Sequence, residues 1–277
     1  MNIKSPAEIT SAAETSGRNK INLTVKHPGR LIVAAMLAGA FISIGGILSL
    51  ITGFGLPGLS ADNPALQKLI SGATFPIGLI LVVVLGAELF TGNNATLIPG
   101  YMNRHYGFKS VVANWTIVYV GNFIGALLFT WALVYACGLT AADPWHSAIV
   151  NIAKAKTSMP FLTVLLKGIG ANWFVCLGVW LALSGHSFAE KALGCWIPVM
   201  AFVALGYEHC IANMFYLPLG MMEGADVSIG QAITANLIPA TIGNIIGGAL
   251  FVGCLLYTYD AADEDRSEEG GGRRSIK

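Results

Sequence analysis

Long apolar stretches, separated by short polar connections, limit the fold of this chain more than any other feature. A transmembrane helix needs about 20 apolar residues to cross a hydrocarbon core of about 30 Å. Only 11% of the 277 residues are charged, against about 25% in a soluble domain. We therefore expect an all-α membrane protein with six transmembrane helices, in the stretches Leu31 to Ile51, Leu69 to Tyr101, Val111 to Cys137, Phe161 to Ser184, Leu193 to Met222 and Gln231 to Tyr257.

The distribution of lysine and arginine predicts the orientation. These residues gather in the N-terminal segment (residues 1–30), in the second and fourth connections and in the tail (residues 258–277), whereas the other connections carry only Lys68, Lys154 and Lys156. Cytoplasmic connections are enriched in these cations. We therefore expect both termini in the cytoplasm and a multi-pass six-helix domain, residues 31–257, in the cell inner membrane.

The two terminal segments differ in composition. The first thirty residues lack the apolar core of a cleavable signal peptide, so the first membrane helix is expected to direct insertion. The run PAEITSAAETSG predicts a cytoplasmic helix. The charged tail, residues 258–277, is typical of a disordered segment.

The chain contains an internal repeat. GAELFTGN at residues 86–93 matches GYEHCIAN at 206–213, and NWTIVYVGNFIGALLF at 114–129 matches NLIPATIGNIIGGALF at 236–251. Each half, about 31–137 and 161–257, holds three stretches, so the second copy is expected to have inverted topology. Both the second and the fifth stretch are too long for one plain helix, which predicts two broken helices that meet around one pathway.

Glu208 and His209 stand at the second break. Ionisable residues inside a membrane mark functional sites by default. We expect His209 to face the pathway, where it could exchange a proton or donate a hydrogen bond to an anion, and Glu208 to face away and hold the broken segment. The alternative is a core histidine satisfied by Asn172 or Asn213.

The first copy has Leu89 at the position of His209, followed by Thr91. The Thr91 hydroxyl could bond His209 or a passing anion, or it could cap the broken helix. Two lysines could concentrate anions at the outer mouth: Lys167, for which snorkelling to the interface is the alternative, and Lys156 in the outer connection.

Large apolar side chains surround these polar groups. They could form constrictions that block hydrated ions, or they could be ordinary packing residues. They are Phe75, Leu79, Leu89, Phe90, Val175 and Phe202. The five cysteines lie in or beside apolar stretches without CxxC spacing, so we expect no disulfide, metal or cofactor. The net charge of +1 gives no support for a nucleic-acid partner.

Four segments, GAELFTGN, KGIGANWFVCLGVW (167–180), GYEHCIANMF and TIGNIIGGALFVG, resemble the formate/nitrite transporter family, and the similarity runs from about Lys26 to Tyr257. The resemblance implies an aquaporin-like protomer that assembles as a pentamer with one pore in each protomer. It implies passage of small monovalent anions such as formate, nitrite or hydrosulfide.

The resemblance also implies roles for individual residues. Leu79, Leu89 and Phe90 would form an inner constriction, and Phe75, Val175 and Phe202 an outer one. His209 would stand between them with Thr91 opposite. Asn172 and Asn213 would line or order this site, while Glu208 would hold the fifth helix.

A dry constriction is a costly place for a bare anion. We therefore expect the anion to take a proton, cross as the neutral acid and ionise again, with His209 acting either as a proton relay or as a hydrogen-bond donor only. Formate is the expected substrate, and nitrite or hydrosulfide the alternative. Three other classes of protein are the alternatives. A water or glycerol channel would carry paired Asn-Pro-Ala boxes at the breaks, and this sequence has none. An intramembrane enzyme would need a nucleophile, for which Cys210 is the nearest candidate, and a structural scaffold would tolerate the replacement of His209.

Overall fold

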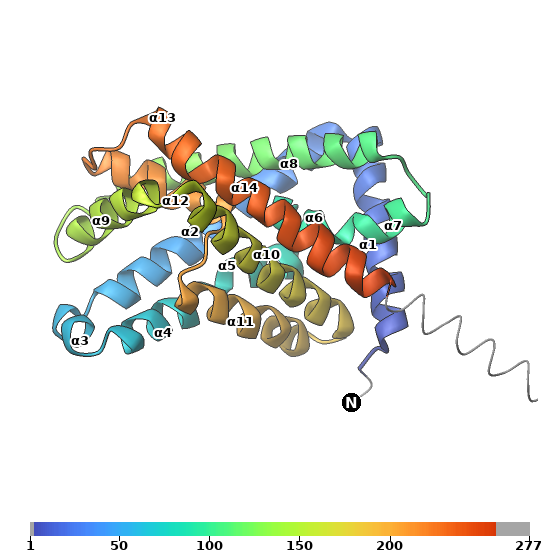
Figure 1. The fold of residues 1–277 in the computed structure, drawn as a ribbon, viewed down its shortest axis with the longest axis horizontal. Coiled ribbons are helices and arrows are strands. Elements are labelled where there is room, and N and C mark those ends of the chain that lie inside the picture. The colour runs from blue at the N-terminus through green and yellow to red at the C-terminus, as the bar shows by residue number, and fades with distance from the viewer. Residues whose placement is uncertain (1–2, 259–277) are drawn as a thin grey trace, which may run out of the picture.

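The computed structural model describes residues 3–258, and within that range every regular element is a helix (Figure 1). In chain order the helices are α1 (Pro6–Lys26), α2 (Pro28–Phe54), α3 (Pro57–Asp62), α4 (Pro64–Thr74), α5 (Ile77–Leu85), α6 (Phe90–Thr96), α7 (Ile98–Met102), α8 (Phe108–Phe129), η1 (Thr130–Tyr135), α9 (Trp145–Ser158), α10 (Phe161–Ser184), α11 (Phe188–Leu205), α12 (Cys210–Met222), α13 (Ile229–Gln231), η2 (Ala232–Leu237), α14 (Ile238–Ile245) and η3 (Ile246–Cys254).

Six helical segments of the described chain are long and apolar enough to cross a membrane, which confirms the predicted number of crossings. They span Pro28–Phe54, Pro64–Leu85, Phe108–Tyr135, Phe161–Ser184, Phe188–Leu205 and Ile229–Thr258. The second and fifth segments stop early, at Leu85 and Leu205, and shorter helices continue after each stop. The two breaks therefore lie in the two stretches that were too long for one plain helix.

Both breaks have the same backbone conformation. Gly86 and Gly206 cap the preceding helices with φ of 71° and 70°, in the left-handed region that favours glycine. The chain then runs extended through Leu89 (φ −106°, ψ 124°) and His209 (φ −106°, ψ 116°) before α6 and α12 begin. The repeated Gly-x-Glu-x pattern thus gives one local structure twice.

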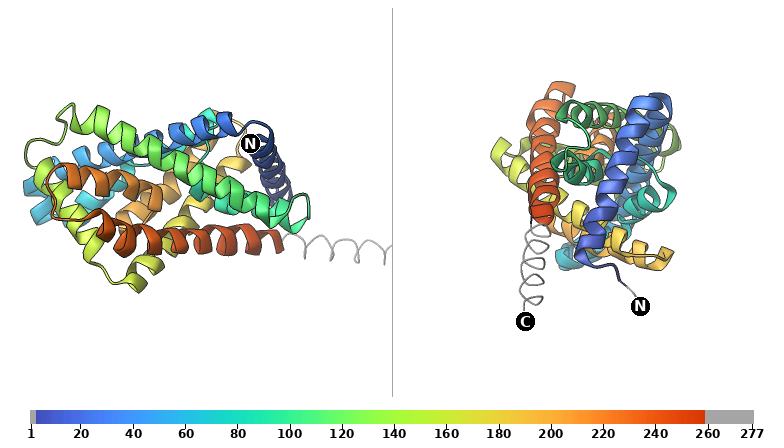
Figure 2. Two further views of the ribbon diagram at one scale, coloured as in Figure 1. Left: turned by 90° about the horizontal axis from the view of Figure 1, so that it is seen from above. Right: turned by 90° about the vertical axis from the view of Figure 1, so that its right-hand side faces the viewer.

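Helix α1 runs crosswise to the long helices at one end of the molecule, and α9 lies at the other end (Figures 1 and 2). The helix predicted around PAEITSAAETSG is therefore present. It begins at a capping box in which the Glu8 N–H donates to the Ser5 hydroxyl oxygen, while the Ser5 N–H and hydroxyl donate to the Glu8 carboxylate. These bonds lower the pKa of the Glu8 carboxyl. The tail predicted to be disordered lies outside the described residues from 259 onward.

Polar contacts hold α1 against the rest of the protein. The Lys4 ammonium donates to the Leu183 carbonyl at the end of α10 (2.7 Å). The Glu14 carboxylate pairs with His105 and accepts a hydrogen bond from Asn103 (2.8 Å), both in the connection that follows α7. A third contact, from Lys20, reaches the first break and belongs to the site below.

Helices α2 and α8 pack with their backbones in contact, because glycine replaces a side chain at the crossing. A Cβ added to Gly125 would overlap the Met36 carbonyl of α2, and one added to Gly39 would overlap the Asn122 carbonyl of α8. This close approach matters for the site, because Asn122 reaches the first break from α8.

Gly125→Ala is expected to destabilise the protein by about 1–3 kcal/mol, since the two helices must separate to admit the methyl group. The measurement is the temperature at which the detergent-purified protein loses its monodisperse size-exclusion peak. Gly29→Ala, at a helical position where an added Cβ meets nothing within 4 Å, is the matched control and should leave that temperature unchanged.

Candidate transport site

The two breaks meet at a hydrogen bond between Thr91 and His209. The Thr91 hydroxyl lies 2.8 Å from His209 Nε2, and both residues are almost fully buried. His209 Nδ1 accepts the backbone N–H of Ala212 at 3.1 Å, so the ring also caps α12. A ring nitrogen that accepts an N–H carries no proton, so neutral His209 holds its proton on Nε2 and donates it to Thr91.

His209 is the polar member of a narrow apolar chamber. The chamber has a volume of about 10 Å³, close to the smallest space that holds one water. Phe202 stacks on the His209 ring, with 5.9 Å between ring centroids, and Phe75 meets Phe202 edge-on. The residues that line the chamber are Ile42, Phe75, Leu79, Leu89, Val175, Val199, Phe202 and His209.

Five of the six predicted constriction residues line this chamber, and Phe90 does not. Phe90 packs edge-on against Tyr119 and Trp115 of α8, with centroids 5.0 and 6.3 Å away. Ile42 and Val199 line the chamber but were not singled out in the sequence. Nothing in the sequence distinguishes them from other apolar helix residues, because the repeat does not mark their positions.

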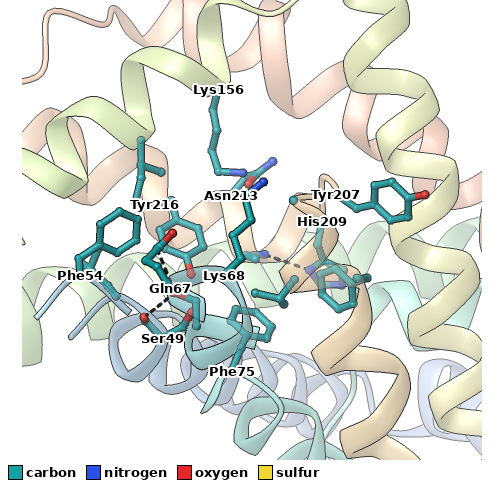
Figure 3. A pocket seen from close by; sticks show the side chains of 17 residues that line it. Ser49, Phe54, Gln67, Lys68, Phe75, Lys156, Tyr207, His209, Asn213 and Tyr216 are labelled. Atoms are coloured by element: carbon teal, nitrogen blue, oxygen red, sulfur yellow. Dashed lines mark hydrogen bonds between the residues drawn. The ribbon is translucent and has the colours of Figure 1, made fainter. Parts of the chain in front are cut away.

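A larger cavity lies on each side of the chamber. The Lys156 cavity, of about 240 Å³, shares Phe75, Phe202 and His209 with the chamber (Figure 3). The Lys20 cavity, of about 560 Å³, shares Leu79 and Leu89 with it. Because α1 contributes Lys20 to its lining, the second cavity lies at the α1 end of the molecule. Cavity, chamber and cavity therefore follow one another through the protein.

A buried ion pair holds the glutamate of the second break. Glu208 is 3% exposed, and its two carboxylate oxygens accept from the Lys156 ammonium of α9 at 2.9 and 3.0 Å. Asn213 and Asn236 donate to the same carboxylate at 2.7 and 3.0 Å. Glu208 thus faces this network, while the neighbouring His209 faces the chamber.

The first break has a matching network. Both Glu88 oxygens accept from the Lys20 ammonium of α1 at 2.9 Å, and Asn93 donates to Glu88 at 2.8 Å and to Asn114 at 2.9 Å. Lys20 was not predicted as a site residue, because it lies outside the aligned repeat. Asn93 and Asn114 lie within the repeated segments, where each aligns with an asparagine of the second copy. This recurrence of asparagine could have identified them as site residues from the sequence.

One asparagine clamps the exposed backbone of each break. Asn244 accepts the Cys210 N–H (2.8 Å) and donates to the carbonyls of Glu208 (2.9 Å) and Gly168 (2.8 Å). Asn122 accepts the Phe90 N–H (2.9 Å) and donates to the carbonyls of Glu88 (2.8 Å) and Ala35 (2.7 Å). Each asparagine thus satisfies, inside the protein, one N–H and one carbonyl that its break frees, as a membrane requires.

Asn172 and Asn213 order the site without a side-chain hydrogen bond to the His209 ring, although the Asn213 backbone N–H donates to the His209 carbonyl at 2.9 Å. Asn172 donates to the Thr91 carbonyl at 3.1 Å and to the Asn244 carbonyl at 2.7 Å. Asn213 donates to the Glu208 carboxylate, as described above, and also to Asn236 Oδ1 at 2.6 Å. The alternative in which either asparagine satisfies the histidine does not match the structure, where Thr91 and Ala212 are its partners.

The two predicted outer-mouth lysines are placed differently. Lys156 lines the cavity named after it, whereas Lys167 lines none of the described cavities. Lys167 contacts the second break only through its backbone carbonyl, which accepts the Glu208 N–H at 3.3 Å. Lys68, on α4, also lines the Lys156 cavity, although the sequence analysis used it only for orientation.

Comparison with known proteins bears on what this site does. The sequence profile of the family described as Formate/nitrite transporter matches residues 7–258. The chain belongs to the formate/nitrite transporter family. The resemblance seen in the four sequence segments is thereby confirmed, and so is the expectation of a multi-pass membrane transporter or channel rather than an enzyme.

Individual members of the family are similar over nearly their whole length. The chain is 41% identical to the Uncharacterized transporter YrhG of Bacillus subtilis, covering 97% of this chain and 98% of that protein. It is 39% identical to a protein of Methanothermobacter thermautotrophicus named "Probable formate transporter", covering 92% and 97%. A solved structure described as a pentameric formate channel with formate bound matches with a TM-score of 0.73 and 31% identity, covering 85% and 98%.

Proposed function

We propose that this member of the formate/nitrite transporter family passes formate together with a proton through the chamber at His209. Support for the substrate comes from the relative named for formate and from the formate-bound structural neighbour. The observation that supports the mechanism is the chamber, whose lining is apolar apart from His209. Nitrite and hydrosulfide, anions of weak acids of similar size, are the alternative substrates.

The chamber favours a neutral form of the substrate. A bare anion would lose its hydration there, and the energetic penalty for an unpaired charge in such surroundings is large. A formate ion in the Lys156 cavity therefore binds a proton from water on one carboxylate oxygen and crosses as formic acid. It then releases the proton to water in the Lys20 cavity. The net movement is one formate and one proton, with no covalent change.

His209 acts in this scheme as a hydrogen-bond donor. Its Nε2–H can leave the Thr91 hydroxyl and donate to an oxygen of the passing acid. The freed Thr91 hydroxyl can then also bond the acid, as a donor or as an acceptor. A proton added at Nδ1 would instead displace the Ala212 N–H and remove the cap of α12. This geometry favours water over the imidazole as the source of the proton.

Assembly and orientation complete the proposal. The pentameric neighbour supports a homopentamer with a pathway in each protomer. The repeated ion pairs and asparagine clamps at the two breaks support the inverted 3+3 repeat. With both termini in the cytoplasm, the Lys20 cavity faces the cytoplasm and the Lys156 cavity faces outward.

Uptake into proteoliposomes tests the function. The purified protein should admit formate, and the initial rate should rise by about tenfold per unit as external pH falls, because the protonated fraction of a carboxylic acid rises by that factor well above its pKa. His209→Ala removes the donor in the chamber and should lower formate uptake at least about tenfold, the effect of about 1.4 kcal/mol.

The controls separate the components of the proposal. Empty liposomes correct for direct diffusion of formic acid through lipid. If formate, nitrite and hydrosulfide all fail to enter, the transport function is wrong. If formate enters at a rate independent of pH, the proton-linked mechanism is wrong. If His209→Ala retains the full rate, the donor role of His209 is wrong.

A further inference from the structure

The two cavities differ in their charge, although the two ion pairs that flank them are alike. The Lys20 cavity has Lys20 and Glu88 as its charged lining residues, and these pair with each other. The Lys156 cavity has Lys156 and Lys68 in its lining, and Lys156 pairs with Glu208. One cation of the Lys156 cavity is therefore left over.

The leftover cation is Lys68. Both oxygens of Glu208 engage the Lys156 ammonium, so the charge of Lys156 is balanced at short range. Lys68 is exposed in the second turn of α4, and within residues 3–258 no acidic side chain forms an ion pair with it. An unpaired ammonium at the wall of a cavity attracts small anions from solution.

We propose that Lys68 is the residue that draws the substrate anion into the Lys156 cavity, whereas Lys156 is a structural counter-charge for Glu208. The inference rests on the proposed function, because it concerns the same pathway. It assigns the recruiting role to Lys68, whereas the sequence had suggested Lys167 and Lys156 for that role at the outer mouth. Its ligand class is any small monovalent anion, since a flexible ammonium is a point charge without a preferred geometry.

The expected size of the effect follows from Coulomb's law. Two unit charges about 7 Å apart in water attract each other by about 0.6 kcal/mol, which corresponds to about a threefold increase in local anion concentration. At about 1 M ionic strength the screening length falls to about 3 Å, so the attraction vanishes. An effect of Lys68 that persists in high salt would therefore have another origin.

Formate uptake into proteoliposomes, measured far below saturation at low and at high ionic strength, tests the proposal. Lys68→Gln should lower the initial rate about threefold at low salt and leave it unchanged near 1 M salt, and Lys68→Arg should keep the wild-type rate. Lys154→Gln, an exposed lysine of α9 outside the cavity lining, is the matched control and should have no effect.

Chemical rescue separates charge from shape. In Lys68→Cys, purified and treated before reconstitution with 2-aminoethyl methanethiosulfonate, the thiolate attacks the thiosulfonate sulfur, a disulfide forms and methanesulfinate leaves. The added ammonium should restore the rate of formate uptake at low salt. Treatment with methyl methanethiosulfonate, which adds a neutral group to the same thiol, should not restore it. Wild-type protein treated in the same way controls for the other cysteines, of which Cys137 is exposed.

Each outcome decides the inference. If the wild type transports formate but Lys68→Gln matches it at low salt, the recruiting role is wrong while the proposed function stands. A loss that is equal at both salt concentrations, or rescue by the neutral reagent, also overturns the recruiting role. If the wild type transports no anion, both proposals fail.

Discussion

Replacing Asn244 by leucine is expected to prevent the chain from accumulating as a folded membrane protein. Leucine has a similar volume but no polar atoms, so the Cys210 N–H and the carbonyls of Glu208 and Gly168 would all lose their partner. A buried backbone group left without a hydrogen bond costs about 1–3 kcal/mol. Three such groups together use up much of a total stability of about 5–15 kcal/mol.

The measurement is the yield and the thermal midpoint of the size-exclusion peak in detergent. Asn122→Leu, which removes the same set of contacts at the first break, should fail to a similar degree. Asn151→Leu changes an exposed asparagine of α9 and should accumulate normally. Asn244→Asp keeps the acceptor for Cys210 but sets a buried carboxylate oxygen against the carbonyls of Glu208 and Gly168, so it should fail like Asn244→Leu. A stable Asn244→Leu protein would show that the clamp does not hold the break.

Replacing Lys156 by methionine is expected to destabilise the protein by about 3–5 kcal/mol, because it leaves the Glu208 carboxylate buried without its cation. Asn213 and Asn236 would still donate to that carboxylate, but neither carries a charge. The thermal midpoint in detergent should fall accordingly. Lys154→Met, on the exposed side of the same helix, should leave it unchanged.

A double variant identifies the cause. Lys156→Met combined with Glu208→Gln removes the buried charge as well as its partner, and the glutamine side chain can still bond the two asparagines. We expect the double variant to recover more than half of the stability lost in Lys156→Met, since contacting residues couple by about 0.5–3 kcal/mol. If the double variant is less stable than Lys156→Met alone, the unpaired charge is not the reason for the loss.

Much of the architecture could be predicted from the sequence, because membrane crossing depends on local properties. The length of each apolar stretch determines a crossing, and the glycines at 86 and 206 mark the breaks wherever the rest of the chain lies. The sequence also predicted different environments for Glu208 and His209, and the structure gives the reason: the chain is extended at this point, and adjacent residues of an extended segment point in opposite directions.

Contacts between distant segments could not be predicted in the same way. Lys20 pairs with Glu88 across 68 positions of the chain, and no sequence pattern links them. Lys167 stands within the fourth predicted crossing and Lys68 directly precedes the second, yet of these two only Lys68 lines a described cavity. Phe90 follows Leu89 at the break but begins a helix, which turns its ring toward α8 instead of the chamber.

The placement of Lys20 and Lys156 has a consequence for how the protein is built. Neither lysine belongs to one of the six crossing segments of the described chain: α1 carries the first and α9 the second. The six crossing segments by themselves would hold two buried carboxylates without their cations and would repel anions from the pathway proposed above. Helices α1 and α9 thus each supply the cation that balances a buried glutamate. A chain that began at His27 would lack Lys20, and the unpaired Glu88 carboxylate would give the cavity at the first break a negative charge.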